Sequence, residues 1–194
     1  MKMFFLRRRR LRSQSATSLG LEERYVKSWK RGWLMRVLLD TSFLLPVFGV
    51  NVDIPNIRVQ LLSLSRKADL LVNSLSVLEA KWIILKFSRK EPDLLKAFGD
   101  GLNLLVRGKQ FEIIPFYLPE VDAVATAIYN YHRDYIDCSI LASAYVEANT
   151  LVTLEKKKME ELAGLIHPEL SVYRKISSKL TVATLSETVK DMNI

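Results

Sequence analysis

Four short, mainly apolar segments recur along the chain from Met35, and helical patterns separate them. The segments are Arg36–Leu39, Asp69–Val72, Phe111–Pro115 and Leu151–Leu154. Short unbroken apolar runs are typical of strands that are buried on both faces, as in parallel sheets. Their alternation with helices predicts a three-layer α/β/α fold with a central, mostly parallel sheet of four or five strands. The tail after about His167 is expected to add one more strand and helix.

Apolar residues at helical spacing fill the intervals between these segments. The expected helices are Phe43–Phe48, Ile57–Ser65, Ser76–Ser88, Leu94–Leu105, Pro119–Tyr131 and one from Tyr135 that ends before Asn149. Ser76 is placed to cap its helix, and Glu79 follows it at the spacing of a capping box.

The net charge of the chain is concentrated at its amino end. Residues 1–34 hold ten Lys and Arg against two Glu and so carry the whole formal charge of +8. The basic charge therefore says nothing about the partners of the region 35–194, which is predicted to be the folded domain. Three interpretations of residues 1–34 are open: a disordered arm that contacts RNA, a targeting segment, or translation assigned from too early a start codon.

Composition argues against several classes of protein. No apolar run approaches the roughly 18 residues needed to span a bilayer. A single cysteine, Cys138, cannot form an internal disulfide, and it lies in an apolar stretch typical of the core. With only His132 and His167 beside it, a Cys/His zinc site is not expected, and neither histidine has a partner nearby in the sequence. A reducing, cytoplasmic location is predicted.

Acidic residues stand where a parallel sheet would gather them. Asp40 and Glu155 each follow an apolar strand, Glu79 lies near the start of the helix after the second strand, and Asp137 opens a later helix. Ligands of open α/β sheets bind beyond the carboxyl ends of the strands. Carboxylates about 5 Å apart repel by roughly 3 kcal/mol per pair, so the group predicts a cation between them. Oxygen ligands alone suit Mg²⁺ or Mn²⁺, which can promote hydrolysis of a phosphodiester.

Each acid also has an ordinary structural interpretation. Asp40 and Asp137 are placed to cap the helices that follow them, and Glu79 can complete a capping box with Ser76. Glu155 begins a charged run that would normally be a solvated face. The metal-site hypothesis therefore depends on the joint order of the acids along the predicted strands.

The same residues resemble those of PIN domains, over about Met35 to Leu165. The resemblance lies in Asp40-Thr41-Ser42, Ser76-Val77-Leu78-Glu79-Ala80, the segment Tyr135–Ala142, and Leu151-Val152-Thr153-Leu154-Glu155. It implies that Asp40, Glu79, Asp137 and Glu155 form the catalytic Mg²⁺ or Mn²⁺ site, with Thr41 or Thr153 holding a water or the scissile phosphate. It also implies an endoribonuclease that leaves 5′-phosphate and 3′-hydroxyl ends, a homodimer and, for a VapC-like toxin, a small antitoxin partner.

One position departs from the family pattern, which usually has Asp where this chain has Glu155. Asp134, three residues before Asp137, is an alternative source of a carboxylate. Two other functions therefore stay open: a PIN-fold binding or assembly module without catalysis, and a nuclease directed at DNA.

Overall fold

The computed structural model describes residues 35–170 and 180–192. The chain divides into two units, Met1–Leu34 and Met35–Ile194. The predicted extension over residues 1–34 lies outside the described residues. In the part of the chain that is described, none of the helices is long and apolar enough to cross a membrane.

Five parallel strands form one sheet in the order β3-β2-β1-β4-β5. The strands are β1 (Met35–Leu39), β2 (Ala68–Asn73), β3 (Phe111–Ile114), β4 (Thr150–Val152) and β5 (Thr181–Ala183). The predicted parallel sheet is confirmed, and β5 is the additional strand expected in the tail. The central strand β1 lies between β2 and β4, and helices bury both of its faces, which explains why Val37–Leu39 are apolar without alternation.

The strand register brings the carboxyl ends of the central strands to one level. Leu39 at the end of β1 pairs with Val72 of β2 and with Val152 of β4. The next residue, Asp40, continues the ladder, since its N–H donates to the carbonyl of Val152 at 3.0 Å. Four polar residues lie at this level, and each is either the last residue of a strand or the one directly after it. They are called the edge row: Asn73, Asp40, Thr153 and Thr184.

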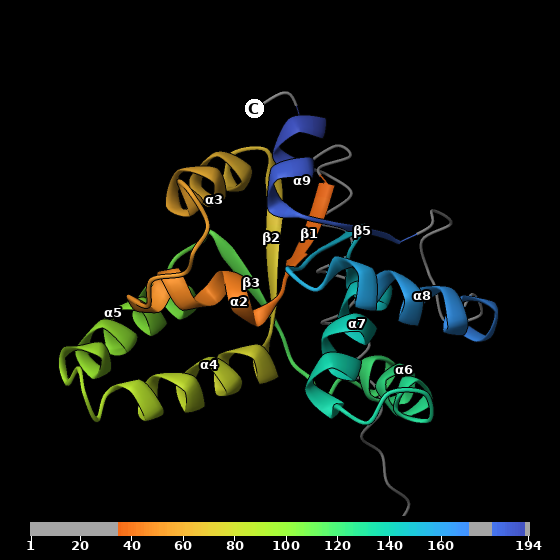
Figure 1. Ribbon diagram of the computed structural model, residues 1–194. Helices are drawn as coiled ribbons and strands as arrows, with labels where there is room; N and C mark the ends of the chain where they lie inside the picture. Colours follow the sequence, from red (N-terminus) through yellow and green to blue (C-terminus); the bar gives the residue numbers. More distant parts are fainter. Residues whose placement is uncertain (1–34, 171–179, 193–194) are drawn as a thin grey trace, which may run out of the picture. The chain divides into compact units, whose positions relative to one another are not determined.

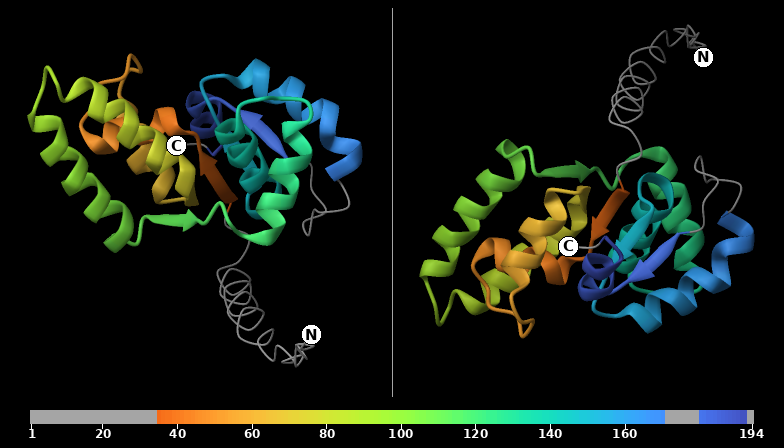
Figure 2. Two further views of the ribbon diagram at one scale, coloured as in Figure 1. Left: turned by 90° about the horizontal axis from the view of Figure 1, so that it is seen from below. Right: turned by 90° about the horizontal axis from the view of Figure 1, so that it is seen from above.

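Helices cover both faces of the sheet, as predicted for a three-layer fold (Figures 1 and 2). The α-helices described are α2 (Thr41–Leu44), α3 (Ile57–Ser65), α4 (Ser74–Phe87), α5 (Asp93–Arg107), α6 (Pro119–Tyr129), α7 (Tyr135–Glu147), α8 (Lys156–Leu170) and α9 (Leu185–Asp191). A short 3-10 helix, η1 (Leu45–Phe48), follows α2 directly.

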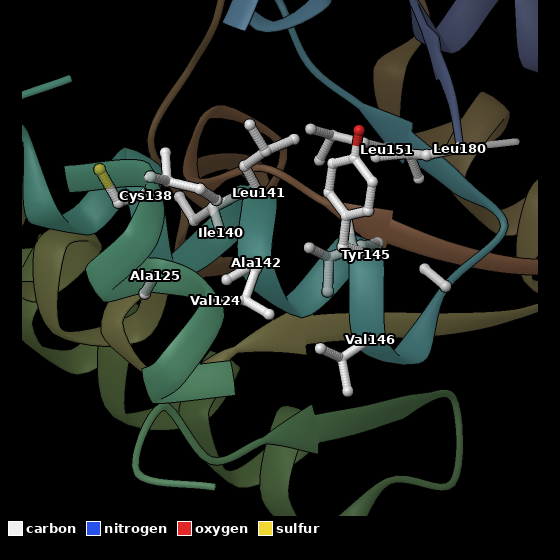
Figure 3. Packing of buried hydrophobic residues seen from close by; sticks show 14 of the residues in the cluster. Val124, Ala125, Cys138, Ile140, Leu141, Ala142, Tyr145, Val146, Leu151 and Leu180 are labelled. Carbon is white, nitrogen blue, oxygen red and sulfur yellow. The ribbon is translucent and has the colours of Figure 1, made fainter. Parts of the chain in front are cut away.

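One face of the sheet packs against α6, α7 and α8. Leu38, Leu71 and Leu151 from three neighbouring strands point into this layer and are fully buried. Helix α7 supplies most of the packing surface, because every residue from Cys138 to Glu147 is buried (Figure 3). Burial raises the pKa of the Cys138 thiol to about 11, which agrees with its predicted role as a core residue.

The other face packs against the remaining helices. Val37 and Leu39 of β1 lie among residues of α3 and α9, and Val72 of β2 lies among residues of α4 and α5. Alternate residues of β1 and β2 thus serve opposite layers, as the two-residue period of a strand requires. Burial of this apolar surface is the main source of stability for the fold.

Three predicted boundaries are wrong. The helix expected over Phe43–Phe48 is divided into α2 and η1, with Pro46 in the first turn of η1 and Gly49 closing it at a left-handed φ of 86°. The fourth strand was expected to end at Leu154, but β4 ends at Val152 and Leu154 is exposed. Helix α4 begins two residues before Ser76, because Asn73 caps it by accepting from the Leu75 N–H at 2.7 Å.

Candidate active site

Asp40 lies in the middle of the edge row, where β1 turns into α2. Its carboxylate caps α2 by accepting from the Thr41 N–H at 2.6 Å, and it also accepts from the Ser42 hydroxyl at 3.3 Å. From β4, the neighbouring strand, the buried Thr153 donates its hydroxyl to Asp40 Oδ2 at 2.9 Å. Asp40 therefore does cap α2. The same hydrogen bonds hold its carboxylate at the sheet edge, so the capping role is compatible with a functional one.

Glu79 reaches the same place from α4. Its Oε2 accepts a hydrogen bond from the Thr41 hydroxyl at 2.6 Å. The predicted capping box with Ser76 is wrong, because Ser76 lies inside the first turn, fully buried and without a hydrogen-bond partner among the described residues. Thr41 thus sits beside Asp40 and fixes Glu79 through its hydroxyl.

Asn73 sets the position of the helix that carries Glu79. Besides capping α4, its amide Nδ2 donates to the Ser143 hydroxyl at 2.7 Å, and to the Ser139 hydroxyl at 3.0 Å. These serines belong to α7, so one fully buried side chain ties β2, α4 and α7 together. A buried polar network whose members are satisfied favours one arrangement of its elements.

Asp137 enters the site from the first turn of α7. Asp134, the residue considered as an alternative carboxylate, caps this helix by accepting from the Ile136 N–H at 2.9 Å and, at 3.4 Å, from that of Asp137. The Asp137 Oδ2 atom lies 2.9 Å from Nε2 of His132 and 2.7 Å from Nζ of Lys158.

Two partners of Asp137, His132 and Lys158, were not predicted from the sequence. His132 was expected to lack a partner, yet it contacts Asp137 from the loop before α7. Its spacing of five residues matches no helical or strand period, so no simple signal marks it. Lys158 is three residues after Glu155, a spacing that places both on one helical face. That spacing was a usable signal for the Glu155–Lys158 pair, although not for Asp137.

Glu155 lies apart from the edge row. Because β4 ends at Val152, Thr153 occupies the place next to Asp40, and Glu155 begins the approach to α8. The side chain of Glu155 is 58% exposed and is tied to Lys158 at 2.7 Å. Lys158 thereby joins Glu155 to Asp137, which is only 19% exposed.

The charges of two other predicted acids act on Asp40. The pKa of Asp40 is raised from 3.8 to about 6, chiefly by burial and further by the charges of Asp137 and Glu79. The hydrogen bonds from Thr153 and Thr41 act in the opposite direction without cancelling the shift. Thr41 links Asp40 to Glu79 through its N–H and its hydroxyl, while Asp137 acts on Asp40 through its charge from the first turn of α7.

A comparison with protein-family models matches residues 37–165 to the PIN domain. The chain belongs to the PIN-domain family. This match covers more than half of the 194 residues and confirms the resemblance drawn from the acidic motifs. A comparison with curated proteins finds no match. PIN domains have a nuclease-type fold and generally depend on a divalent metal.

The oxygen donors at this edge fit a divalent cation. Carboxylates and threonine hydroxyls are the ligand types that Mg²⁺ and Mn²⁺ prefer. A cation would also relieve the unfavourable burial that raises the pKa of Asp40. Within the described ranges, no three His, Cys, Asp or Glu side chains are gathered closely enough to hold a metal ion. Glu79 Oε2 accepts from the Thr41 hydroxyl and Asp137 Oδ2 contacts Lys158, so one oxygen of each carboxylate is already engaged.

The raised pKa of Asp40 predicts how the metal-free PIN domain responds to pH. A folded-state pKa near 6, above the 3.8 of the unfolded chain, favours the protonated carboxyl in the fold. Its contribution to the free energy of unfolding is present below about pH 4 and is lost as the pH rises to about 6. We expect Asp40→Asn to be more stable than the parent at pH 7.5 by roughly 2 kcal/mol, with no difference at pH 4.

Thermal melts in metal-free buffer at several pH values measure this difference. Asn keeps a side-chain oxygen for the Thr41 N–H, so the helix cap survives the substitution. A variant that melts below the parent at pH 7.5 would mean that the hydrogen bonds of the Asp40 carboxylate stabilise the fold by more than burial and the neighbouring charges destabilise it.

Proposed function

We propose that this PIN domain is a divalent-metal-dependent endoribonuclease. Asp40, Glu79, Asp137 and Glu155 hold Mg²⁺ or Mn²⁺, which polarises the scissile phosphodiester and makes a water more acidic for attack. Thr153 and Thr41 orient the carboxylates of Asp40 and Glu79 and are accessory candidates for binding the water or the phosphate. Asp134 supports the site by capping the helix that carries Asp137.

One observation carries this proposal. Asp40, Glu79 and Asp137 lie close enough for the charges of the last two to raise the pKa of the first. Carboxylates whose charges act on one another at the edge of a sheet repel, so their mutual effect is unfavourable without a counter-ion. A site that binds a divalent cation explains why they are kept together.

The proposal is tested by incubating the full chain with fluorescent RNA and with DNA of the same sequence. We expect RNA to be cut with Mg²⁺ or Mn²⁺ present, and cutting to stop with EDTA. The products should carry 5′-phosphate and 3′-hydroxyl ends, which ligation and phosphatase treatment identify. Faster cleavage of the DNA would replace the ribonuclease proposal with a DNA-directed nuclease.

A second candidate function is a PIN-fold binding or assembly module without catalysis. The exposed position of Glu155 and its ion pair with Lys158 favour this alternative, since both turn a predicted ligand away from Asp40. Calorimetric titration with Mn²⁺ separates the two functions. A parent protein that binds no Mn²⁺ would support the module.

The partners and setting proposed for the nuclease follow from the family. They are an RNA substrate, a second copy of the chain in a homodimer, and a small antitoxin that covers the acidic edge if the protein is a VapC-like toxin in the cytoplasm. A short open reading frame directly upstream of the gene would favour the toxin over a processing enzyme. Light scattering of the purified chain tests the dimer.

A further inference from the structure

Lys158 lies in the first turn of α8, the helix that follows Glu155. Its Nζ lies 2.7 Å from Oδ2 of Asp137 and 2.7 Å from Oε2 of Glu155. The two carboxylates come from separate elements, α7 and the residue before α8. A single ammonium group therefore joins two of the four predicted metal ligands.

The other lysines at the start of α8 point elsewhere. Lys156 pairs with Glu187 at 2.8 Å and with Glu160 at 3.8 Å. Lys157 is exposed to solvent. The buried Met159 anchors this turn of the helix in the core and leaves the adjacent Lys158, 42% exposed, directed at Asp137. The packing of α8 thus places the Lys158 backbone where its side chain can reach Asp137.

Lys158 competes with a divalent cation for these carboxylates, because its ammonium already contacts Asp137 Oδ2 and Glu155 Oε2. Bringing a doubly charged ion next to the Lys158 ammonium would also cost repulsion in this partly buried site. On the far side of Asp137, His132 contacts the same Oδ2 atom. Asp137 therefore has its Oδ2 fully engaged before any metal arrives.

We propose that Lys158 is the resident counter-cation of this site: it holds Asp137 and Glu155 together in the metal-free protein and is displaced when the divalent ion binds. This inference rests on the proposed metal-dependent function. Lys158 acts here as a positioning residue, since it works through the two carboxylates. It raises the metal concentration needed for binding, because a cation that takes Asp137 Oδ2 or Glu155 Oε2 must displace the ammonium from that oxygen.

This role predicts effects of opposite sign, which a purely structural lysine would not produce. Removing the ammonium leaves two neighbouring carboxylates without their counter-charge, so the metal-free protein loses stability. The same change removes the competitor for the ligands, so the metal binds more tightly. A lysine that only supported the fold would weaken both stability and metal binding when it was replaced.

The test compares Lys158→Met with the matched control Lys157→Met in the full-length chain. Both variants remove one positive charge from the same turn of α8, so a general change in electrostatic potential affects them alike. We expect Mn²⁺, followed by calorimetry, to bind Lys158→Met about five- to tenfold more tightly than Lys157→Met. The metal-free melting temperature of Lys158→Met should be the lower of the two, and saturating Mn²⁺ should reverse that order.

A second pair of variants confirms the contact without using metal. In an Asp137→Asn background, Lys158→Met should lower the melting temperature less than it does in the parent, because the ion pair is already weakened. Lys158→Arg keeps the positive charge and should bind Mn²⁺ no more tightly than the parent. Circular dichroism of each variant checks that the fold is retained.

Equal Mn²⁺ affinity in Lys158→Met and Lys157→Met would overturn the inference, as would weaker binding by Lys158→Met. Absence of Mn²⁺ binding in both the parent and Lys158→Met would also overturn it. The proposed nuclease fails on a different result: a parent that binds Mn²⁺ yet cuts no nucleic acid refutes the activity alone. The affinity ratio of the two methionine variants still decides the role of Lys158 in that case.

Discussion

Asp40→Asn should lower the rate of metal-dependent RNA cleavage by about 10³-fold, a loss of about 4 kcal/mol in transition-state stabilisation. The reason is the central position of Asp40. It lies in the edge row between Asn73 and Thr153, and the charges of Glu79 and Asp137 both act on it. Replacing its charge with a neutral amide removes the acid that the other two predicted ligands surround.

The substitution is suited to separating catalysis from folding. Asparagine has the shape of aspartate and caps helices equally well, so the bond from the Thr41 N–H is retained. The metal-free variant is expected to be at least as stable as the parent at neutral pH. A loss of activity together with a higher melting temperature would therefore locate the effect in the site.

Single-turnover cleavage of a fluorescent RNA with saturating Mn²⁺ measures the rate. Asp100→Asn is the matched control, because Asp100 is an exposed carboxylate on α5, and we expect it to cut at the parental rate. Cleavage by Asp40→Asn at the parental rate would remove the basis for a carboxylate-held metal. The activity would then have to come from another part of the protein or from a contaminant.

The fold was predictable because its strands are covered on both faces. Val37, Leu38 and Leu39 are all fully buried, so the sequence of β1 is apolar without alternation. Once such strands alternate with helices, chain connectivity favours a parallel sheet. The same reasoning predicts that Asp40, Glu79 and Asp137 lie toward one edge, since residues just beyond parallel strands share that edge.

The failures share a physical cause, which is that local patterns compete with contacts made in the tertiary structure. Ser76 fits a helix cap, but Asn73 makes a better one because its amide also satisfies buried serines of α7. Leu154 looks like a strand residue, yet β4 ends where Thr153 turns its hydroxyl to Asp40. The contact of Lys158 with Asp137 joins residues 21 positions apart, so no spacing rule could indicate it.

The second large effect is expected on stability, from a substitution of Arg36 at the amino end of β1. Arg36 donates to Oε2 of Glu147 on α7 and to Oε2 of Glu112 on β3, each at 3.0 Å. The side chains of Arg36 and Glu147 are only 13% and 11% exposed. Backbone bonds reinforce this connection, since the Arg36 N–H donates to the side chain of Asn149 and its carbonyl accepts from the Asn149 N–H.

Arg36→Met should lower the free energy of unfolding by about 3 kcal/mol. Methionine retains the apolar length of the side chain, so the loss comes mainly from removing the Arg36 guanidinium from the nearly buried Glu147. For a domain of this size the melting temperature should fall by roughly 6–12 °C. Urea denaturation of the parent and variant, followed by circular dichroism, gives the two free energies.

The double variant Arg36→Met/Glu147→Gln distinguishes the ion pair from the packing of the arginine stem. If the loss arises from an uncompensated carboxylate, neutralising Glu147 should recover more than half of it. Glu112→Gln alone should cost under about 1 kcal/mol, because its side chain is 45% exposed and water can replace the arginine. A double variant no more stable than Arg36→Met would assign the effect to packing. Because Arg36 lies at the amino end of the sheet, away from the edge row, the stability lost in this variant should leave the Mn²⁺ affinity of the folded protein unchanged.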